Sequence, residues 1–255
     1  MARAGVSVKR RIAVLMDVWR DLIDEWERGG HLSRSRVVDM LRSTYEREGI
    51  SPLKGAANPP DLYEKEMASL YVVGKHGMGL EREYPELFDS VFSDEIRFEQ
   101  AIEVLLSEEP DRARMKVQAL LGGSIDDNIV ARMLRLKLTE VYFGFSNPDS
   151  FKLLLKRFTE AFPEHRRVAS KYARFYIAFR VADAIQKGEV RDRITKEALK
   201  QALALELSWL DKILPDDSYI RKIAEEVFHL PRRILDPVLS SGRGGRRREM
   251  GRAFH

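Results

Sequence analysis

The chain has 255 residues, of which 44% are hydrophobic and 33% are charged, so it is long enough to bury one large core or two modest ones. It contains no cysteine, which excludes disulfide bonds and thiolate metal sites and is compatible with a reducing compartment. The net charge is +4, and 30 arginines stand against 14 lysines. Because charged residues are many and labile amides are few, we expect a thermophilic source.

Apolar residues at helical spacing predict a first helix over residues 8–28. A second helix is expected to start at a cap formed by Ser33 or Ser35 and to end at Gly49. Residues 50–60, ISPLKGAANPP, hold three prolines and predict an irregular surface segment. The next three helices are expected over residues 60–73, 85–92 and 94–107, with the KHGMG sequence ending the first of them.

Helices also dominate the second half of the chain. Ser124 follows two glycines and opens a capping box, so we expect it to cap a helix that continues through Val141. Further helices are expected to start at Asn147, at Pro163 (continuing to about Lys187) and at Thr195, and the last one covers residues 217–229.

These elements predict an all-α protein, a compact array of about ten helices with a flexible basic C-terminal tail. We find no alternating strand pattern and no fixed-period repeat. A soft boundary divides residues 1–112, with an acidic end, from a basic part at 113–238, and the two could form one domain. Residues 239–255 form the Gly/Arg tail.

Charge is laid out unevenly along the helices. Residues 81–111 carry eleven acids and two arginines, whereas residues 151–180 carry eight bases and two acids. The two segments could face each other across an internal interface, or the basic one could be a docking surface and the acidic one its solvated counterweight.

The tail accounts for the whole net charge. Its sequence, SGRGGRRREMGRAFH, has five arginines and one glutamate, while residues 1–240 carry 39 bases and 39 acids. A neutral body with a Gly/Arg arm suggests that the arm binds a polyanion, and RNA is the polyanion we expect. The alternative interpretation of the tail is a solvated terminus that keeps the protein soluble. The candidate RNA-binding residues in the tail are Arg243, Arg246, Arg247, Arg248 and Arg252.

The helix HRRVASKYARFYIAFR, residues 165–180, is the second candidate surface. Arg167, Lys171 and Arg174 follow i, i+4, i+7 spacing and form one stripe, with Arg166 beside it. A neighbouring stripe of Tyr172, Phe175, Tyr176 and Phe179 would suit base stacking in single-stranded RNA, but we expect these aromatics to belong to the core. Lys9, Arg10 and Arg11 could add a third basic cluster.

No pattern in the sequence identifies a reaction. The five histidines are scattered, adjacent acid pairs do not face each other on a helix, and no glycine-rich loop follows a strand. We therefore expect no catalytic residues, no metal and no cofactor. Because no apolar stretch is long enough for a membrane span and the start does not resemble a secretory signal, a cytoplasmic protein without membrane contact is expected.

The segment SPLKGAANPPDLYEKEMASLYVVGKHGMGL, residues 51–80, resembles the hallmark of a crenarchaeal family of helical proteins of unknown function. The helix pair from Val8 to Gly49 and the segment at 84–106 are similar to that family in order and spacing. The resemblance implies an archaeal origin and no particular mechanism. Archaeal ribosomes carry small proteins with Arg/Gly tails, and this tail is similar in style.

The sequence thus favours a non-enzymatic, RNA-associated helical protein, bound to the ribosome or involved in its maturation. The first alternative is a protein-interaction scaffold in which PLKGAANPP and the acidic segment at 81–111 contact a basic partner. Apolar exposure around Leu53–Tyr63 would favour that alternative. The second alternative is a helical enzyme of unknown reaction.

Overall fold

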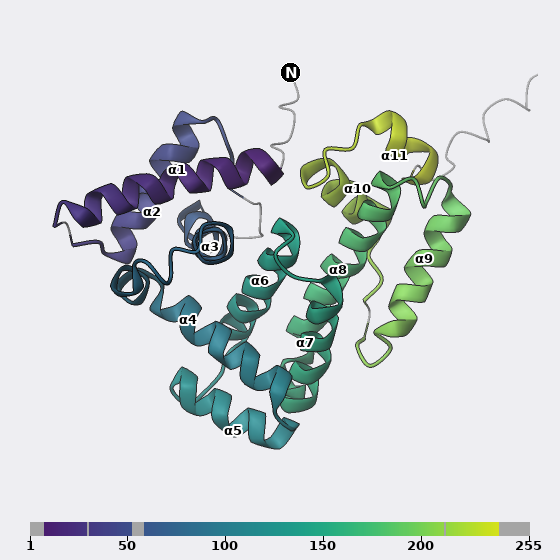
Figure 1. Cartoon of the computed structure of the whole chain (residues 1–255). Coiled ribbons are helices and arrows are strands. Elements are labelled where there is room, and N and C mark those ends of the chain that lie inside the picture. Colours follow the sequence, from purple (N-terminus) through teal and green to yellow (C-terminus); the bar gives the residue numbers. More distant parts are fainter. Residues whose placement is uncertain (1–7, 30, 53–58, 212, 240–255) are drawn as a thin grey trace, which may run out of the picture. The chain divides into compact units, whose positions relative to one another are not determined.

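The computed structural model describes residues 8–29, 31–52, 59–211 and 213–239. These residues form eleven α-helices and two short helical segments of other types, and they contain no β-strand (Figure 1). The predicted all-α class is therefore confirmed. The tail at 240–255, with its five candidate RNA-binding arginines, lies outside the described residues. None of the helices described is at once long enough and apolar enough to cross a membrane.

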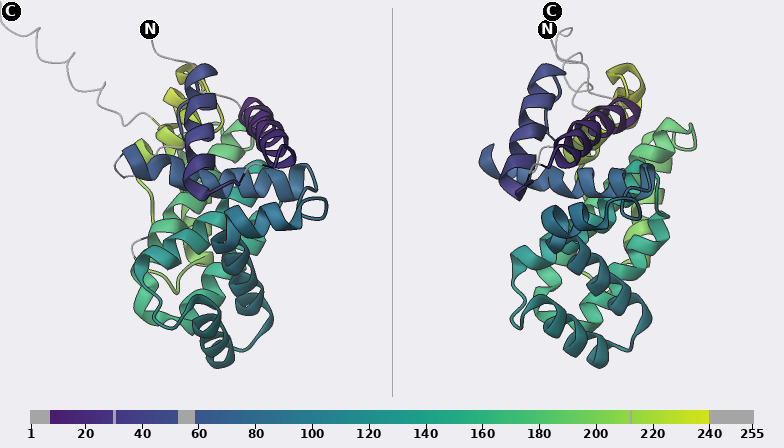
Figure 2. Two further views of the ribbon diagram at one scale, coloured as in Figure 1. Left: turned by 90° about the vertical axis from the view of Figure 1, so that its left-hand side faces the viewer. Right: turned by 60° about the vertical axis from the view of Figure 1, so that its left-hand side comes forward.

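The described residues divide into two compact units. The larger unit contains residues 8–176, 207–211 and 213, and the smaller contains 177–206 and 214–239. Both consist of helices and their connections (Figure 2). The division expected near residue 112 stays a prediction, and that residue lies inside the larger unit.

The larger unit begins with α1 (Val8–Glu27) and α2 (Arg34–Arg47). The apolar stripe of α1 is completely buried at Leu15, Val18, Trp19 and Leu22, as its helical spacing predicts. Of the two possible caps for α2, the structure uses Ser33, whose Oγ accepts a hydrogen bond from the N–H of Arg36 at 3.3 Å.

The next helix, α3 (Pro59–Val72), ends one residue before the predicted end at residue 73, ahead of the KHGMG sequence. One π-helical turn, η1 (Val73–Gly77), follows it, and the N–H of Met78 bonds to the carbonyl of Val73 at 3.0 Å. The glycines in this stretch are tolerated because neighbouring side chains pack directly on the backbone, as described below. A π-helical turn inside a helix is uncommon and is often found at functional sites.

Residues 85–107 form α4 (Pro85–Ser107), in which two helical stretches meet at a kink, in agreement with the predicted helices at 85–92 and 94–107. The expected break is a kink at Phe92, whose backbone is non-helical at φ −115° and ψ 24°. The kink places Phe88 and Phe92 against Trp19, with ring centroids 5.0 and 5.4 Å apart. The aromatic core of the larger unit is built around this contact.

Three further helices complete most of the larger unit. They are α5 (Pro110–Leu121), which the sequence did not predict, α6 (Asp127–Phe143) and α7 (Pro148–Ala161). The prediction that Ser124 caps α6 was wrong. The carboxylate of Asp126 accepts the N–H groups of Asn128 and Ile129 at 2.9 and 2.8 Å, because it directly precedes the first turn.

A 3₁₀ turn, η2 (Pro163–His165), leads into α8 (Arg166–Gln186), which contributes its first part to the larger unit and the remainder to the smaller. The smaller unit also contains α9 (Arg193–Glu206), α10 (Asp217–Glu226) and α11 (Arg232–Leu239). Helix α11 was not predicted.

Helix α9 starts two residues before the predicted cap, Thr195. The N–H of Thr195 donates to the carboxylate of Asp192 at 2.8 Å, so Asp192 performs the capping. The prediction failed because both residue types are good caps and the sequence places them three positions apart. In the same unit, the ammonium of Lys196, which is 2% exposed, pairs with Asp217 at the start of α10.

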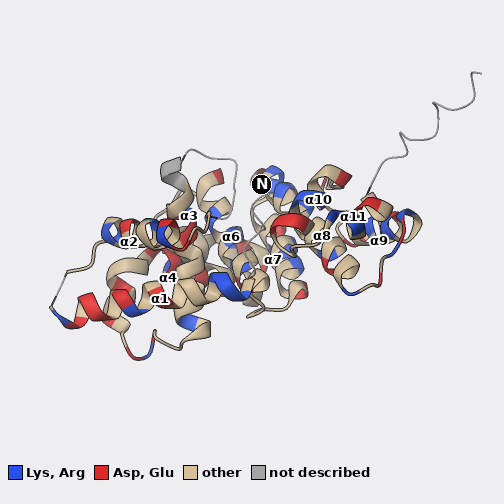
Figure 3. Ribbon diagram, turned by 90° about the horizontal axis from the view of Figure 1, so that it is seen from above, with Lys and Arg blue, Asp and Glu red and all other residues tan. Residues whose placement is uncertain are grey.

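The carboxylates of α4 find partners within the larger unit. Glu95 is 4% exposed, and its carboxylate accepts hydrogen bonds from both terminal nitrogens of Arg34 at 2.7 and 2.8 Å. The carboxylate of Asp94 accepts a hydrogen bond from Arg132 at 2.8 Å. Helix α4 also packs against α7, which carries part of the basic segment at 151–180. These ion pairs nevertheless run to arginines outside that segment. Lys, Arg, Asp and Glu are interspersed along the helices (Figure 3).

Candidate functional site

The predicted basic stripe lies on the solvent side of α8. Arg167, Lys171 and Arg174 are all exposed, as their common face predicts. The side chains of Arg167 and Lys171 form no hydrogen bond or ion pair with any other residue that the structure describes. Arg166 differs, because it is half-buried and its guanidinium lies 3.5 Å from the carboxylate of Asp211.

Of the four aromatics expected in the core, Tyr176 is buried, whereas Tyr172, Phe175 and Phe179 are half-buried. The hydroxyl of Tyr172 donates to the carbonyl of Ala131 at 2.6 Å, and burial raises the pKa of that hydroxyl. Tyr176 is 1% exposed and packs against Phe151, with ring centroids 6.1 Å apart. Between residues 166 and 180 the only exposed residues are Arg167, Lys171 and Arg174, so the exposed side chains of this part of α8 are cationic.

The basic cluster expected near the N-terminus loses one member to the core. Arg11 is 5% exposed, and its guanidinium donates to the carbonyl of Ser51 at 2.8 Å and lies 3.5 Å from the carboxylate of Glu66. Tyr45 donates to the other oxygen of that carboxylate at 3.1 Å. Arg11 is therefore a structural residue, because the apolar stripe of α1 turns it inward.

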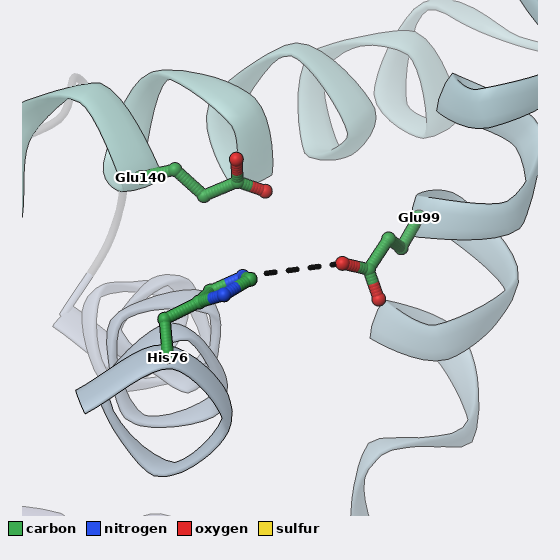
Figure 4. A group of neighbouring side chains, drawn as sticks. All are labelled: His76, Glu99 and Glu140. Atoms are coloured by element: carbon green, nitrogen blue, oxygen red, sulfur yellow. Dashed lines mark ion pairs between the residues drawn. The ribbon is translucent and has the colours of Figure 1, made fainter. Parts of the chain in front are cut away.

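A second candidate site was not expected from the sequence. His76 of η1, Glu99 of α4 and Glu140 of α6 converge, and one possible ligand atom of each lies within 4.8 Å of the others (Figure 4). The imidazole Nε2 of His76 is 4.0 Å from Oε1 of Glu99. Glu140 is 6% exposed, whereas the side chain of His76 retains 31% of its exposure. The cluster thus has a buried side and an open side.

Three neighbouring side chains orient the two carboxylates. Oε2 of Glu99 accepts hydrogen bonds from the hydroxyl of Tyr71, at 2.6 Å, and from the ammonium of Lys75. Oε2 of Glu140 accepts from Lys137 at 2.6 Å. Each carboxylate therefore has one oxygen bound by neighbouring donors, and Oε1 of Glu99 faces the imidazole.

The pKa values of the donors reflect this arrangement. Burial, and then the hydrogen bond to Glu99, raise the pKa of the Tyr71 hydroxyl, which stays protonated as a donor. Burial alone would lower the pKa of Lys75, but its hydrogen bond to Glu99 and the charge of that carboxylate raise it overall. The raised pKa favours the charged form of Lys75.

Two glycines determine where the histidine lies. A Cβ added to Gly74 would lie 2.3 Å from the indole of Trp19, and one added to Gly77 would lie 3.2 Å from the ring of Phe145. Because neither glycine has a side chain, η1 packs closely on both aromatic rings. His76 lies between these two contacts, and its ring centroid is 5.9 Å from that of Phe145.

The spacing of the histidines gave no sign of this cluster, but the position of one glutamate in the sequence did. In the apolar pattern of α6, Glu140 occupies an inward position that follows Met133 and Leu136. A carboxylate in a core-facing register requires a partner, because an unpaired buried charge is costly. Neither of the two other members could have been deduced, since they come from separate helical elements.

Comparisons with known proteins give one result. No curated protein and no solved structure matches this chain. The sequence profile of one family does match, over residues 6–239, which is nearly all of the helical region described above. The chain therefore belongs to the family described as an uncharacterised protein conserved in archaea, DUF2192.

Proposed function

We propose that this protein binds RNA without catalysing a reaction and that it is bound to the ribosome or takes part in its maturation. The observation that carries the proposal is the exposure of Arg167, Lys171 and Arg174 on one face of α8, where Arg167 and Lys171 have no acidic partner among the described residues. An exposed arginine without a carboxylate beside it can offer its guanidinium to a phosphate in two parallel hydrogen bonds. The five arginines of the tail add the same chemistry.

The burial of the neighbouring aromatics narrows the kind of RNA contact. Tyr176 is buried, and Tyr172, Phe175 and Phe179 are half-buried, so most of the aromatic surface that could stack on unpaired bases is packed inside. Contacts to phosphate set position and affinity but carry no direct sequence information. We therefore infer recognition of the backbone of a structured RNA, such as ribosomal RNA, and not of a single-stranded sequence.

The salt dependence of binding tests this proposal. If six to eight phosphates are contacted, affinity should fall by about a thousandfold or more between about 50 and 200 mM salt, because each contact releases counterions. The experiment measures binding of structured ribosomal RNA to the full chain and to a truncation at residue 240, over a salt series with a neutral competitor. A steep dependence that weakens on truncation supports RNA anchoring by the tail.

Two results would count against the proposal. Binding that does not change with salt would exclude a phosphate interface, and equal, negligible binding by both proteins would make the tail a solubility segment. In the second case the protein-interaction alternative takes precedence.

One observation favours that alternative. On α9, Ile194 is 82% exposed and Leu205 is 75% exposed, and they lie on one face of the helix with the exposed Ala198 and Ala202. Large apolar side chains that share an exposed face are typical of contacts with another protein. The segment at which such exposure was expected lies mostly outside the described residues, and Tyr63 is half-buried, with its ring 6.1 Å from that of Tyr45.

A further inference from the structure

We propose that His76, Glu99 and Glu140 form a binding site for a divalent transition-metal ion of the Zn²⁺ class. One imidazole nitrogen and two carboxylate oxygens are a donor set found in zinc, manganese and iron sites. The possible ligand atoms lie within 4.8 Å of one another, so small side-chain movements would bring all three to one ion. In Figure 4 the side chains of Glu99 and Glu140 extend from two different helices into the space beside the imidazole of His76.

The surroundings of the cluster resemble an outer coordination shell. In metal sites, the carboxylates that bind the ion are themselves hydrogen-bonded through their other oxygen, which fixes their orientation. Tyr71 and Lys75 do this for Glu99, and Lys137 does it for Glu140. The residues from which these bonds come lie on α3, η1 and α6, so the orientation is built into the packing of three elements.

The site is also accessible from one side. Glu140 supplies a nearly buried ligand, whereas His76 is held between Gly74 and Gly77 and keeps 31% of its side-chain exposure. Three protein ligands leave at least one coordination position for water or a small ligand, as in zinc sites that are not purely structural. The π-helical turn that carries His76 is itself the kind of irregularity often found where a helix supplies a functional side chain.

The charges set the expected strength. Lys75 pairs with Glu81 as well as with Glu99, and Lys137 pairs with Glu140, so an incoming dication meets a group of side chains with one net negative charge. The ion must also compete with the lysines for the carboxylates. We therefore expect micromolar binding of Zn²⁺, weaker binding of Mn²⁺, in line with the general order of affinities, and little binding of Mg²⁺, which disfavours imidazole.

The test is titration of the full-length, metal-free protein with Zn²⁺ in a calorimeter. The main variant is His76→Gln, because this side chain is partly exposed and its replacement should leave the fold intact. The second variant is Glu99→Gln. Matched controls are His31→Gln, another exposed histidine, and Glu103→Gln, one turn further along α4. We expect one site per chain and binding weakened by about 100-fold in His76→Gln, since loss of even an outer-shell partner typically costs 10- to 100-fold.

The effect of Zn²⁺ on the melting temperature tests the site even if a variant is less stable than the unmodified protein. Zn²⁺ should raise the melting temperature of the unmodified protein and of both controls, because an ion that binds only the folded state stabilises it, and it should not do so for His76→Gln. Equal Zn²⁺ binding by the unmodified protein and His76→Gln would overturn the proposal, as would the absence of a one-to-one site. A finding that the protein does not bind RNA would not bear on the metal site, because the tail and the α8 stripe share no residue with the cluster of His76, Glu99 and Glu140.

Discussion

The indole of Trp19 occupies the space in which a side chain at position 74 would have to begin. A Cβ added to Gly74 would lie 2.3 Å from two carbons of that indole, well inside normal contact distance. The indole Nε1 of Trp19 donates to the carbonyl of Leu70 at 2.8 Å, one turn before Gly74. Together, the close approach and the hydrogen bond attach α1 to the end of α3 and to the π-helical turn that presents His76.

Replacing Gly74 by alanine should therefore destabilise the larger unit. Because the obstructing atoms belong to a completely buried ring that cannot swing away, we expect a loss of about 1–3 kcal/mol in the free energy of unfolding. Urea denaturation followed by circular dichroism measures it. Gly77→Ala is the matched comparison, since its Cβ would meet the ring edge of Phe145 at 3.2 Å and that ring can shift. Equal losses for the two variants would contradict this account.

The buried pair of Arg11 and Glu66 makes a second prediction. Arg11→Met leaves the carboxylate of Glu66, which is 1% exposed, without its cation, and breaking a buried pair from one side typically costs about 3–5 kcal/mol. The double variant Arg11→Met with Glu66→Met should recover most of that loss, because no buried charge remains. Thermal and urea denaturation of the single and double variants provide the comparison.

Arg20→Met is the control for this pair. Arg20 lies on the same helix and pairs with Asp17 at the surface, so its removal should change stability little. If the double variant were no more stable than Arg11→Met, the loss would come from packing and not from the charge of Glu66.

The cap of α10 makes a prediction that depends on pH. Asp216 accepts from the hydroxyl of Ser218 at 2.6 Å and from the N–H of Tyr219 at 2.8 Å, and these hydrogen bonds lower the pKa of its carboxyl. A lowered pKa in the folded state means that the stabilisation is present above the ordinary pKa of aspartate and is lost as the pH falls through the folded value. Asp216→Ala should cost about 1 kcal/mol at neutral pH, and Asp216→Asn much less.

Amide hydrogen exchange in α10 measures this effect locally. The difference between the unmodified protein and Asp216→Ala should shrink below the ordinary titration range of aspartate, near pH 4. A difference that stays constant down to strongly acidic pH would show that the charge of the carboxylate does not contribute.

The α8 stripe can be tested separately from the tail. Arg167→Gln with Lys171→Gln should weaken RNA binding similarly for all sequences and reduce the slope of log affinity against log salt by about 2, since each phosphate contact contributes roughly 1. The control variant, Lys222→Gln with Arg233→Gln, removes two exposed charges from the smaller unit. An equal change of slope in both variants would mean that overall charge, and not the stripe, governs binding.

Most of the local structure could be predicted from the sequence. The predictions that failed did so for physical reasons that can be named. The spacing of Leu15, Trp19 and Leu22 predicted α1 and its buried face, because burial of an apolar stripe follows directly from helical geometry. The choice of Asp126 over Ser124 as a cap was missed, because both residues are suitable and only the backbone path decides between them. The break that the sequence predicts between residues 92 and 94 is found as the kink of α4 at Phe92.

The all-helical class, the exposure of the α8 stripe and the burial of Tyr176 could be predicted from the sequence, because each depends on residues within a few turns of one helix. The burial of Arg11 with Glu66 and the meeting of His76, Glu99 and Glu140 could not, since they depend on how the helices pack. Those contacts join residues far apart in the chain, and they arise from the packing of helices on one another. Local periodicity shows which side of a helix faces inward, but it does not show which helix it faces.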